Sequence, residues 1–248
     1  MAGRIAYYGG IVTNGLVLAL DAAKKDSYPG SGTVWRDISG NGNHVTLYNG
    51  ISHQDGALVG DGVNDYGRTT NTLNLSGLSA ITINVVCKQP TTTTNALIYE
   101  HTSNYNTFNN YGSVRYGGFG FAINTNGNSM TENYGHFQLI GNNGQAAANA
   151  PLPTTTNYQY YTTVYDFTRA GGSGDNETTV YVNGTQPTQV PYGANNTQTF
   201  VNDYFYLWSR GGSTFFRSSI SQISIYNRAL SATEILQNYN ATKGRYGL

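Results

Sequence analysis

The stretch from residue 215 to 239, FFRSSISQISIYNRALSATEILQNY, changes its hydrophobic period abruptly, and this change constrains the fold more than any other feature. Its first half alternates with the period of two that is typical of a β-strand. One face of this strand would carry Ile220, Gln222, Ser224 and Tyr226, and the other Ser221, Ile223 and Ile225. Apolar residues on both faces predict a strand that is buried on both sides.

The second half of the stretch predicts a short helix. Ser231 and Glu234 have the spacing of a capping box, in which each side chain accepts a hydrogen bond from a backbone N–H at the helix start. We expect the helix to run from about residue 232 to 240. Its apolar stripe would consist of Ile235, Leu236 and Tyr239. A strand that is buried on both sides needs sheets to pair with and to pack against, and the rest of the chain must supply them.

Short strand candidates, separated by turn-forming residues, fill most of the remaining sequence. They are residues 16–21, 45–48, 57–59, 65–69, 80–88, 95–100, 118–124, 134–140, 158–167, 178–182 and 204–208. Turns such as Asn183-Gly184 are typical of connections between antiparallel strands. About a dozen short strands and one late helix predict an all-β fold, a two-sheet antiparallel sandwich or jelly roll.

The composition restricts the compartment and the partners of the chain. Its 13 basic and 13 acidic residues cancel, which argues against the basic stripe of a nucleic-acid-binding protein. Cys87 is the single cysteine, so no intrachain disulfide can form, and its apolar surroundings indicate a small core residue. No stretch approaches the ~18 apolar residues of a membrane span, and the first residues lack the apolar region of a signal peptide. We therefore expect synthesis in a cytoplasm, with no membrane or nucleic-acid partner.

Four stretches carry a resemblance to a known family: LVGDGVNDY, ITINVV, VYVNG and ISIYNRALSATEI, at residues 58–66, 81–86, 180–184 and 223–235. In this order they resemble the laminin-G-like branch of the concanavalin A-like lectin/glucanase fold. The segment LVLALDAAKKDSYPGSGTVWRDISGNGNH further resembles the start of such domains in tailed-phage virion proteins. The resemblance implies a concanavalin A-like jelly roll over residues 15–240. Residues 1–14 would form an arm or edge strand, and 241–248 a tail.

Catalysis is not expected. A glycoside hydrolase of this fold would need two carboxylates at a fixed separation, which the related glucanases carry as Glu-x-Asp-x-x-Glu on one strand. This sequence has four glutamates and lacks that pattern. The one carboxylate pair of similar spacing, Asp175 and Glu177, lies in GGSGDNETT, which is typical of a mobile loop. We therefore expect a protein that is not an enzyme.

Two kinds of binding site remain open. Laminin-G-like modules often hold calcium, which needs six to eight oxygen ligands, at one rim of the sandwich. Asp61, Asn64 and Asp65 could contribute such oxygens, although their spacing fits a turn equally well. Glycan binding would use aromatic rings stacked on sugars, but tyrosine is so abundant here, at 21 residues, that the signal is diluted. The candidate rings are Tyr105, Tyr111, Tyr116 and Trp208.

Two functions are compatible with these features. The first is a non-catalytic structural protein of a tailed-phage virion, with capsid decoration ahead of a tail or fibre role, made in the host cytoplasm. It would act by adhesion to other virion proteins and to itself, as a homo-oligomer. Subunit contacts are expected at the termini, which a partner can tie down, at Ile5, Tyr7, Tyr8, Arg245 and Tyr246. The alternative is a lectin-like module for bacterial surface glycans, with calcium as its one candidate cofactor.

Overall fold

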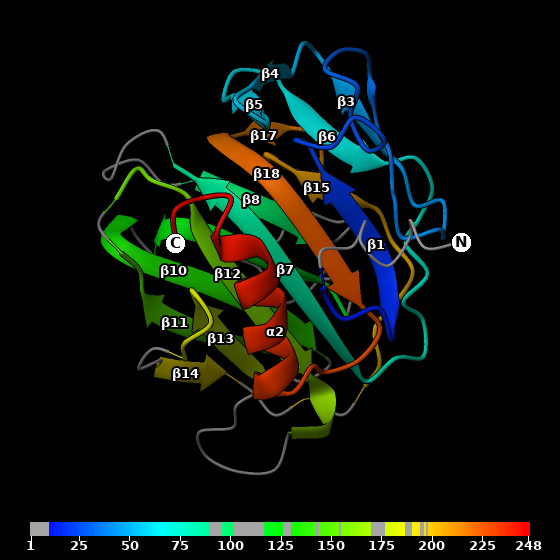
Figure 1. The fold of residues 1–248 in the computed structure, drawn as a ribbon. Coiled ribbons are helices and arrows are strands. Elements are labelled where there is room, and N and C mark those ends of the chain that lie inside the picture. The colour runs from blue at the N-terminus through cyan, green and yellow to red at the C-terminus, as the bar shows by residue number, and fades with distance from the viewer. Residues whose placement is uncertain are drawn as a thin grey trace.

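The computed structural model describes residues 10–89, 96–101, 117–125, 130–141, 144–153, 155–169, 177–186, 190–193, 196 and 198–248. Two large sheets dominate it, and every strand pairing within them is antiparallel (Figure 1). The seven-stranded sheet has the order β13 (Thr178–Val182), β12 (Gln159–Asp166), β7 (Ala80–Lys88), β18 (Arg217–Tyr226), β5 (Ala57–Asp61) and β4 (Ser52–Gln54), and β1 (Leu16–Asp21) also pairs with β18.

The second sheet has nine strands, which lie between residues 34 and 207 of the chain. Its order is β14 (Val190–Gly193), β11 (Gly144–Pro151), β10 (Met130–Gly141), β9 (Phe119–Thr125), β8 (Ala96–His101), β15 (Phe205–Leu207), β6 (Tyr66–Thr69), β3 (Val45–Tyr48) and β2 (Val34–Trp35). A small ribbon is formed by β16 (Ser209–Arg210) and β17 (Thr214–Phe215), and one α-helix, α2 (Ala232–Lys243), follows β18. A 3-10 turn, η2 (Phe167–Arg169), follows β12.

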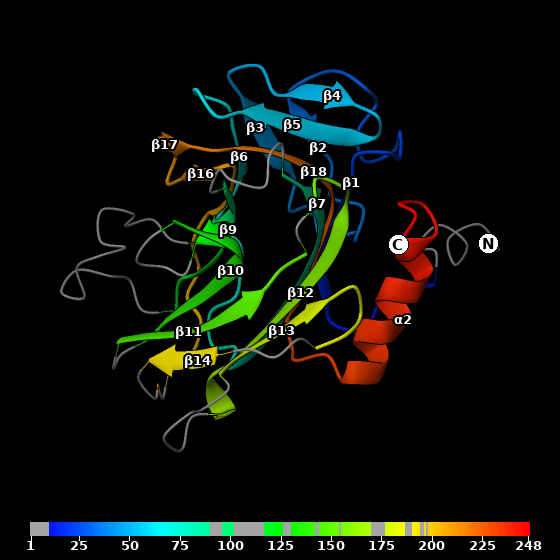
Figure 2. The ribbon, with the colours of Figure 1, turned by 90° about the vertical axis from the view of Figure 1, so that its left-hand side faces the viewer.

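The two sheets pack face to face, and α2 covers the outer face of the seven-stranded sheet (Figure 2). One hydrophobic cluster joins the inner faces of both sheets, with Leu18, Ile83 and Ile223 from the first sheet and Phe121 and Leu207 from the second. Cys87 is a buried, unpaired thiol of this core, as expected. The predicted all-β sandwich with one helix near its end is therefore confirmed.

β18 holds the seven-stranded sheet together. One of its edges pairs with β7, while the other pairs first with β5 and then with β1. The register against β7 shifts between Ile220 and Gln222, so Ser221 is the extra residue of a β-bulge. The Ser221 carbonyl accepts the backbone N–H of Ala22 at 2.8 Å, and its hydroxyl donates to the Gly56 carbonyl at 2.6 Å. The bulge thus lies where β5 gives way to β1.

The bulge also changes which side chains of β18 face the core. Ile220 lies in the same core cluster as Ile223 and Ile225, on the inner face. Placing Ile220 with Gln222, Ser224 and Tyr226 on one face was therefore wrong, because strict alternation does not allow for an inserted residue. The expected burial on both sides of the strand is confirmed by its mostly buried residues.

The helix begins as the sequence predicts. The Ser231 hydroxyl accepts the N–H of Glu234 at 3.3 Å, and the Glu234 carboxylate accepts the N–H of Ser231 at 2.9 Å, which completes the capping box. The helix ends at Lys243 rather than near residue 240. Its buried residues are Ile235, Asn238 and Thr242, whereas the side chain of Leu236 is 46% exposed. The predicted apolar stripe is wrong at Leu236, because the helix packs on a partly polar sheet face that takes Asn238 instead.

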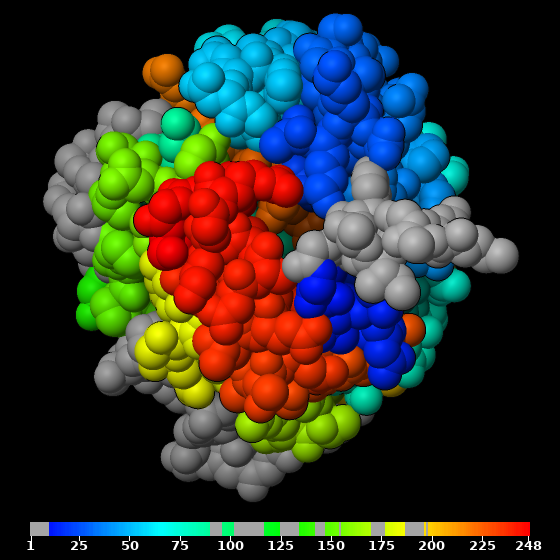
Figure 3. Space-filling view, viewed as in Figure 1, coloured from blue at the N-terminus to red at the C-terminus, as the bar shows by residue number. Residues whose placement is uncertain are grey.

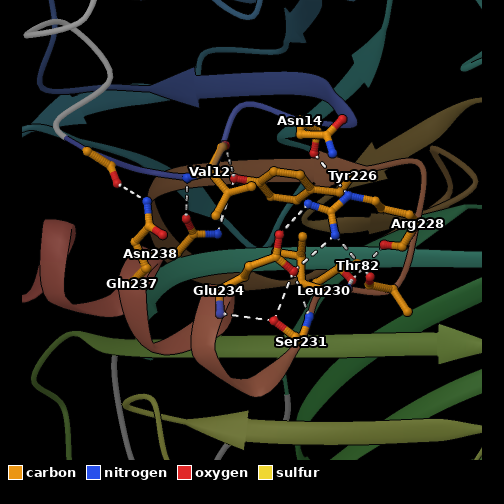
Figure 4. Close-up of polar contacts among 12 residues, drawn as sticks. Val12, Asn14, Thr82, Tyr226, Arg228, Leu230, Ser231, Glu234, Gln237 and Asn238 are labelled. Atoms are coloured by element: carbon orange, nitrogen blue, oxygen red, sulfur yellow. Dashed lines mark hydrogen bonds and ion pairs between the residues drawn. The ribbon is translucent and has the colours of Figure 1, made fainter.

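Residues 10–14 lie against α2 and are bonded to it and to the end of β18 (Figure 4). The Val12 N–H donates to Asn238 Oδ1 at 2.7 Å, and the Tyr226 hydroxyl donates to the Val12 carbonyl at 2.9 Å. Arg228 donates through Nε to the Asn14 carbonyl at 3.2 Å and pairs with the Glu234 carboxylate. This part of the predicted arm is therefore attached to its own chain. Ile5, Tyr7 and Tyr8 lie outside the described residues.

Most predicted strands agree with the structure to within two residues at each end. The exceptions are β10, which begins at Met130 rather than at residue 134, and β18, which begins at Arg217 rather than at residue 220. Four strands of the large sheets, β2, β4, β11 and β14, were not predicted. The sequence of β11, GQAAANAP, shows why: alanine favours helices, and only the pairing of β11 with β10 and β14 makes it a strand. Within the described part of the chain, no helix has the length and apolar character that a membrane span requires.

Candidate functional site

The outer face of the nine-stranded sheet gathers aromatic and charged side chains on neighbouring strands. In β3, Val45 and Leu47 belong to the core, so Tyr48, one residue further along, points outward. Tyr48 is directly opposite Tyr66 of β6, and Arg68 of β6 is directly opposite Tyr206 of β15. Cross-strand partners project to the same side of a sheet. The pairing of β3, β6 and β15 therefore brings these side chains together on the face away from the core.

We call Tyr48, Tyr66, Arg68, Tyr204 and Tyr206 the tyrosine–arginine patch. The Tyr48 and Tyr66 rings stack with centroids 4.4 Å apart and planes 7° from parallel. The Arg68 guanidinium carbon lies 4.3 Å from the centroid of the Tyr204 ring and 5.8 Å from that of Tyr48. Tyr204 in turn meets Tyr206 edge to face at 6.3 Å. The cation is thus held between aromatic rings.

The patch is partly accessible to solvent. Tyr48, Tyr66, Arg68 and Tyr204 are half-buried, and Tyr206 is nearly covered. Burial raises the pKa of the Tyr66 and Tyr206 hydroxyls, so both stay protonated at neutral pH and can donate a hydrogen bond. The patch therefore combines partly exposed rings, hydroxyl donors and one guanidinium, which suits a polar ligand that also has an apolar face.

The β16–β17 ribbon borders this patch. The Phe215 ring of β17 lies 6.0 Å from the Tyr66 ring. Gly212, in the turn of the ribbon, has φ +77°, and a Cβ added there would lie 3.6 Å from the Tyr66 ring and 3.8 Å from the Tyr206 ring. The positive φ is therefore the reason for a glycine in this turn, because a Cβ would make only ordinary van der Waals contacts with the two rings.

A buried carboxylate continues the same face toward the middle of the sheet. Glu100 of β8 is directly opposite Tyr206 on one side and Gly120 of β9 on the other. Its carboxylate lies 3.4 Å from Arg210 Nε, and neither of its oxygens has a hydrogen-bond partner within the described part of the chain. Burial raises the pKa of Glu100 to about 8, although the Arg210 charge opposes the shift. Sequence analysis gave this glutamate no role.

Of the two carboxylates considered for catalysis, the structure describes Glu177 only. Glu177 is buried, and its carboxylate accepts the backbone N–H of Asn196 at 2.7 Å and the side-chain amide of Asn196 at 3.1 Å. It therefore anchors the segment before β15 rather than lying in a mobile loop. Asp175 lies outside the described residues.

Trp208 is a core residue and not a ring available for stacking on a sugar. Its side chain is fully buried, stacks on Trp35 with centroids 6.5 Å apart, and donates through Nε1 to the Ser218 carbonyl at 3.0 Å. The glycan-binding role predicted for Trp208 is corrected accordingly, because a ring with no exposed face cannot contact a ligand. The other three predicted rings, Tyr105, Tyr111 and Tyr116, lie outside the described residues.

The predicted calcium ligands form a turn in the structure. Asp61 accepts the N–H of Val63 at 2.7 Å, which holds the pKa of Asp61 below its usual value. Asp65 accepts the N–H of Asp61 at 3.2 Å, and the Asn64 carbonyl accepts the side-chain amide of Asn49 at 2.7 Å. Among the described residues, no three His, Cys, Asp or Glu side chains group as a metal site would need. The Asp61 carboxylate and the Asn64 carbonyl accept amides of the turn, whereas Asp65 Oδ1 is buried and has no hydrogen-bond partner in the described part of the chain, so calcium binding at this loop stays a prediction.

The C-terminal residues predicted as subunit contacts bind their own chain. Arg245 donates to both carboxylate oxygens of Asp21 at 2.8 Å, and the Tyr246 hydroxyl lies 2.8 Å from Ser221 Oγ. The Tyr246 ring also packs on Tyr158 at 5.1 Å. The part of the chain beyond α2 is thus tied to β1 and β18 of the seven-stranded sheet in this single chain.

A hollow lies between α2, β1 and the outer face of the seven-stranded sheet (Figure 3). Its walls include Asn84, Gln222, Ser224, Thr242 and Arg245. The space open to the centre of a water molecule is about 70 Å³, room for on the order of five waters. Its polar walls are largely bonded to one another: Gln222 donates to Asp21 at 2.7 Å, and Asn84 donates to Ser224 Oγ at 2.9 Å. This hollow is therefore a weaker candidate than the patch.

Sequence analysis missed the tyrosine–arginine patch, although a signal for it was present. Strands were predicted at residues 45–48 and 65–69. Each of them contains a tyrosine two residues away from a threonine or an arginine. Period-two alternation places Thr46 with Tyr48, and Tyr66 with Arg68. Recognising the site also required that these strands pair, which only the structure shows.

Comparisons with known proteins agree with this fold. Residues 61–236 match the sequence model of a family that is described as the concanavalin A-like lectin/glucanases superfamily. No curated protein matches the sequence. Among solved structures, the binding domain of botulinum neurotoxin DC in complex with rat synaptotagmin II superposes with a TM-score of 0.65 at 12% identity, covering 93% of this chain and 52% of that one.

Two further structures share the fold. One is a structure of botulinum neurotoxin type C, whose cell entry is described as dependent upon interaction with two ganglioside molecules. It superposes with a TM-score of 0.63 at 12% identity, covering 92% of this chain and 52% of that one. The other is Trypanosoma rangeli sialidase, with a TM-score of 0.59 at 16% identity, covering 91% of this chain and 32% of that one. The chain thus spans about half of the toxin domains and a third of the sialidase. At these identities the likeness shows the fold alone.

Proposed function

Since the chain belongs to the concanavalin A-like lectin/glucanase superfamily, we propose that it is a non-catalytic module that binds glycans through the tyrosine–arginine patch. The observation that carries this proposal is the stacked, half-exposed pair Tyr48 and Tyr66 beside Arg68. A pyranose ring has an apolar face of C–H groups and a rim of hydroxyls. Aromatic rings pack against the apolar face of the sugar, and tyrosine hydroxyls and a guanidinium form hydrogen bonds with its hydroxyl groups.

Two further considerations support binding without catalysis. A glycosidase needs two carboxylates about 5–9.5 Å apart, and on the row that runs from Arg68 through Tyr206, Glu100 and Gly120 to Gln138 only Glu100 is acidic. The structure whose description names gangliosides, which are glycolipids, shares the fold of this chain. A bacterial surface glycan would suit the neutral, tyrosine-rich surface.

The test is a glycan array followed by calorimetric titration of the best ligand. We expect Tyr66→Ala to weaken the affinity at least tenfold, about 1.4 kcal/mol, because the stacked ring is lost. Tyr239→Ala is the matched control, since Tyr239 is a half-buried tyrosine on α2, away from the patch. Equal effects of the two substitutions, or no glycan bound by the folded protein, would refute the proposal. The titration is repeated with a calcium chelator to test the predicted cofactor.

A second proposal concerns the setting in which the module works. The resemblance of residues 16–44 to the start of domains in tailed-phage virion proteins favours a structural virion protein, with capsid decoration in first place. The two proposals are compatible, because a virion protein can also hold sugars. Light scattering of the purified chain tests the homo-oligomer. Deleting residues 2–12 tests whether the N-terminal arm contacts neighbouring subunits. Unchanged incorporation into particles would show that the arm is not needed for these contacts.

A further inference from the structure

Arg68 is a half-buried cation that forms no ion pair with a carboxylate among the residues that the structure describes. Three other arginines on the described chain, Arg210, Arg228 and Arg245, each lie within 4.0 Å of a carboxylate oxygen. The partners of Arg68 are instead the rings of Tyr48 and Tyr204. A partly desolvated charge without a counter-ion is unfavourable in a folded chain, so a group that carries negative charge would stabilise it.

The guanidinium of Arg68 has unused hydrogen-bonding capacity. Its hydrogen bonds within the described part of the chain go to tyrosine hydroxyls: Nη2 donates to the Tyr48 hydroxyl at 3.4 Å, which is long for a strong bond, and a second bond joins the side chains of Arg68 and Tyr206. Its Nε is buried and has no partner there. Arginine carries five N–H donors in a planar fork. Packing on the Tyr204 ring fixes the plane of this fork and leaves terminal N–H groups for a ligand.

The acidic groups nearest to the patch do not cancel this charge. Glu100 lies one strand further along the row, beside Arg210, and burial favours its neutral, protonated form. Asp203 is buried, and its carboxylate accepts the backbone N–H of Tyr204 at 2.8 Å. The exposed part of the patch therefore presents one positive charge beside two stacked rings.

From this arrangement we infer that the patch selects anionic glycans, in which a carboxylate or sulfate group is held by the Arg68 fork while the sugar ring stacks on Tyr48 and Tyr66. This inference rests on the proposed glycan-binding function and names its ligand class. Planar two-point bonding by arginine is strong for carboxylates and comparable anions. Neutral sugars would still stack on the rings but would leave the guanidinium unpaired.

The experiment compares pairs of ligands that differ only in charge. The probes are an oligogalacturonate and its methyl ester for the carboxylate, and a sulfated galactan oligosaccharide and its desulfated form for the sulfate. We expect at least tenfold tighter binding of one acidic member over its neutral partner, and the pair that shows it identifies the anion. Arg68→Gln removes this preference while binding of the neutral member persists, and Arg68→Lys restores only part of it.

Arg217→Gln is the control for a general loss of positive charge, since Arg217 is exposed on β18. Thermal unfolding establishes that each variant is folded before it is titrated. Equal affinity for acidic and neutral partners, or a preference that survives in Arg68→Gln, overturns the inference and leaves the glycan-binding proposal standing. Failure of every probe to bind, or binding that ignores Tyr66→Ala, overturns both.

Discussion

The two outer faces of this sandwich treat their polar groups in opposite ways. On the seven-stranded sheet, α2 and residues 10–14 cover the face, and Arg228 pairs with the Glu234 carboxylate (Figure 4). Arg245 likewise pairs with Asp21 of the same chain. On the nine-stranded sheet, the half-buried Arg68 contacts the rings of Tyr48 and Tyr204 and bonds the hydroxyls of Tyr48 and Tyr206, with no carboxylate partner in the described part of the chain. Polar groups that the chain satisfies itself contribute to folding, whereas those it leaves unsatisfied are available to a ligand.

This comparison makes a specific separation testable: changes on the covered face should reduce stability, and changes on the patch should reduce binding. The largest effect is expected from Ile235→Ala, because the Ile235 side chain is fully buried between α2 and the sheet. Its loss should lower the free energy of unfolding by about 2–5 kcal/mol, measured by urea denaturation. Leu236→Ala, one residue away but largely exposed, should change it by less than about 0.5 kcal/mol. Similar costs at both positions would contradict the described packing of α2.

A second test concerns the buried carboxyl of Glu100. The folded group ionises near pH 8 because burial disfavours its charged form, whereas in the unfolded chain it ionises near pH 4.5. Between these values the folded state holds a proton that unfolding releases, so stability falls as pH rises from about 4.5 to about 8. We expect a total loss of a few kcal/mol. Glu100→Gln should flatten this part of the pH profile, and a profile with the wild-type slope would show that Glu100 is already ionised in the fold.

The smallest effect is expected at the helix start. Ser231→Ala removes the acceptor for the Glu234 N–H and should cost about 1 kcal/mol of unfolding free energy. Thr233→Ala is the matched control, since Thr233 is exposed in the first turn and has no part in the capping box. Glycan affinity should be unchanged in both variants, because α2 lies on the face opposite the patch. A loss of affinity in Ser231→Ala would break the separation between the two faces.

The sequence predicted what depends on local pattern and missed what depends on pairing. The capping box and the strands at residues 16–21, 45–48, 80–88 and 178–182 follow from period, propensity and turn chemistry, and the structure has them with these bounds. The position of Ile220 could not be predicted, because the bulge at Ser221 exists only where β5 and β1 meet along β18. The strand β11 was missed because its alanine-rich sequence becomes a strand through its neighbours.

The candidate site was less predictable than the fold for a related reason. Trp208 was chosen because a tryptophan near a loop is typical of a sugar-binding ring, yet it fills the core against Trp35. The patch draws on three strands, and two of them, β6 and β15, are far apart along the chain. Its distinguishing property, an arginine without a carboxylate, is a relation between side chains in space. No linear pattern of residues specifies such a relation.

The central position of β18 also has a consequence for how the protein is made. Three strands, β1, β5 and β7, form their ladders on β18, and Leu16 pairs with Tyr226 across nearly the whole chain. While the ribosome is still translating residues before 217, these three strands have edges with no partner from β18. Closing such long loops is slow, and exposed strand edges recruit other chains. The growing polypeptide therefore passes through an aggregation-prone stage that ends only when its last strand emerges, so lower synthesis rates or chaperones should raise its yield.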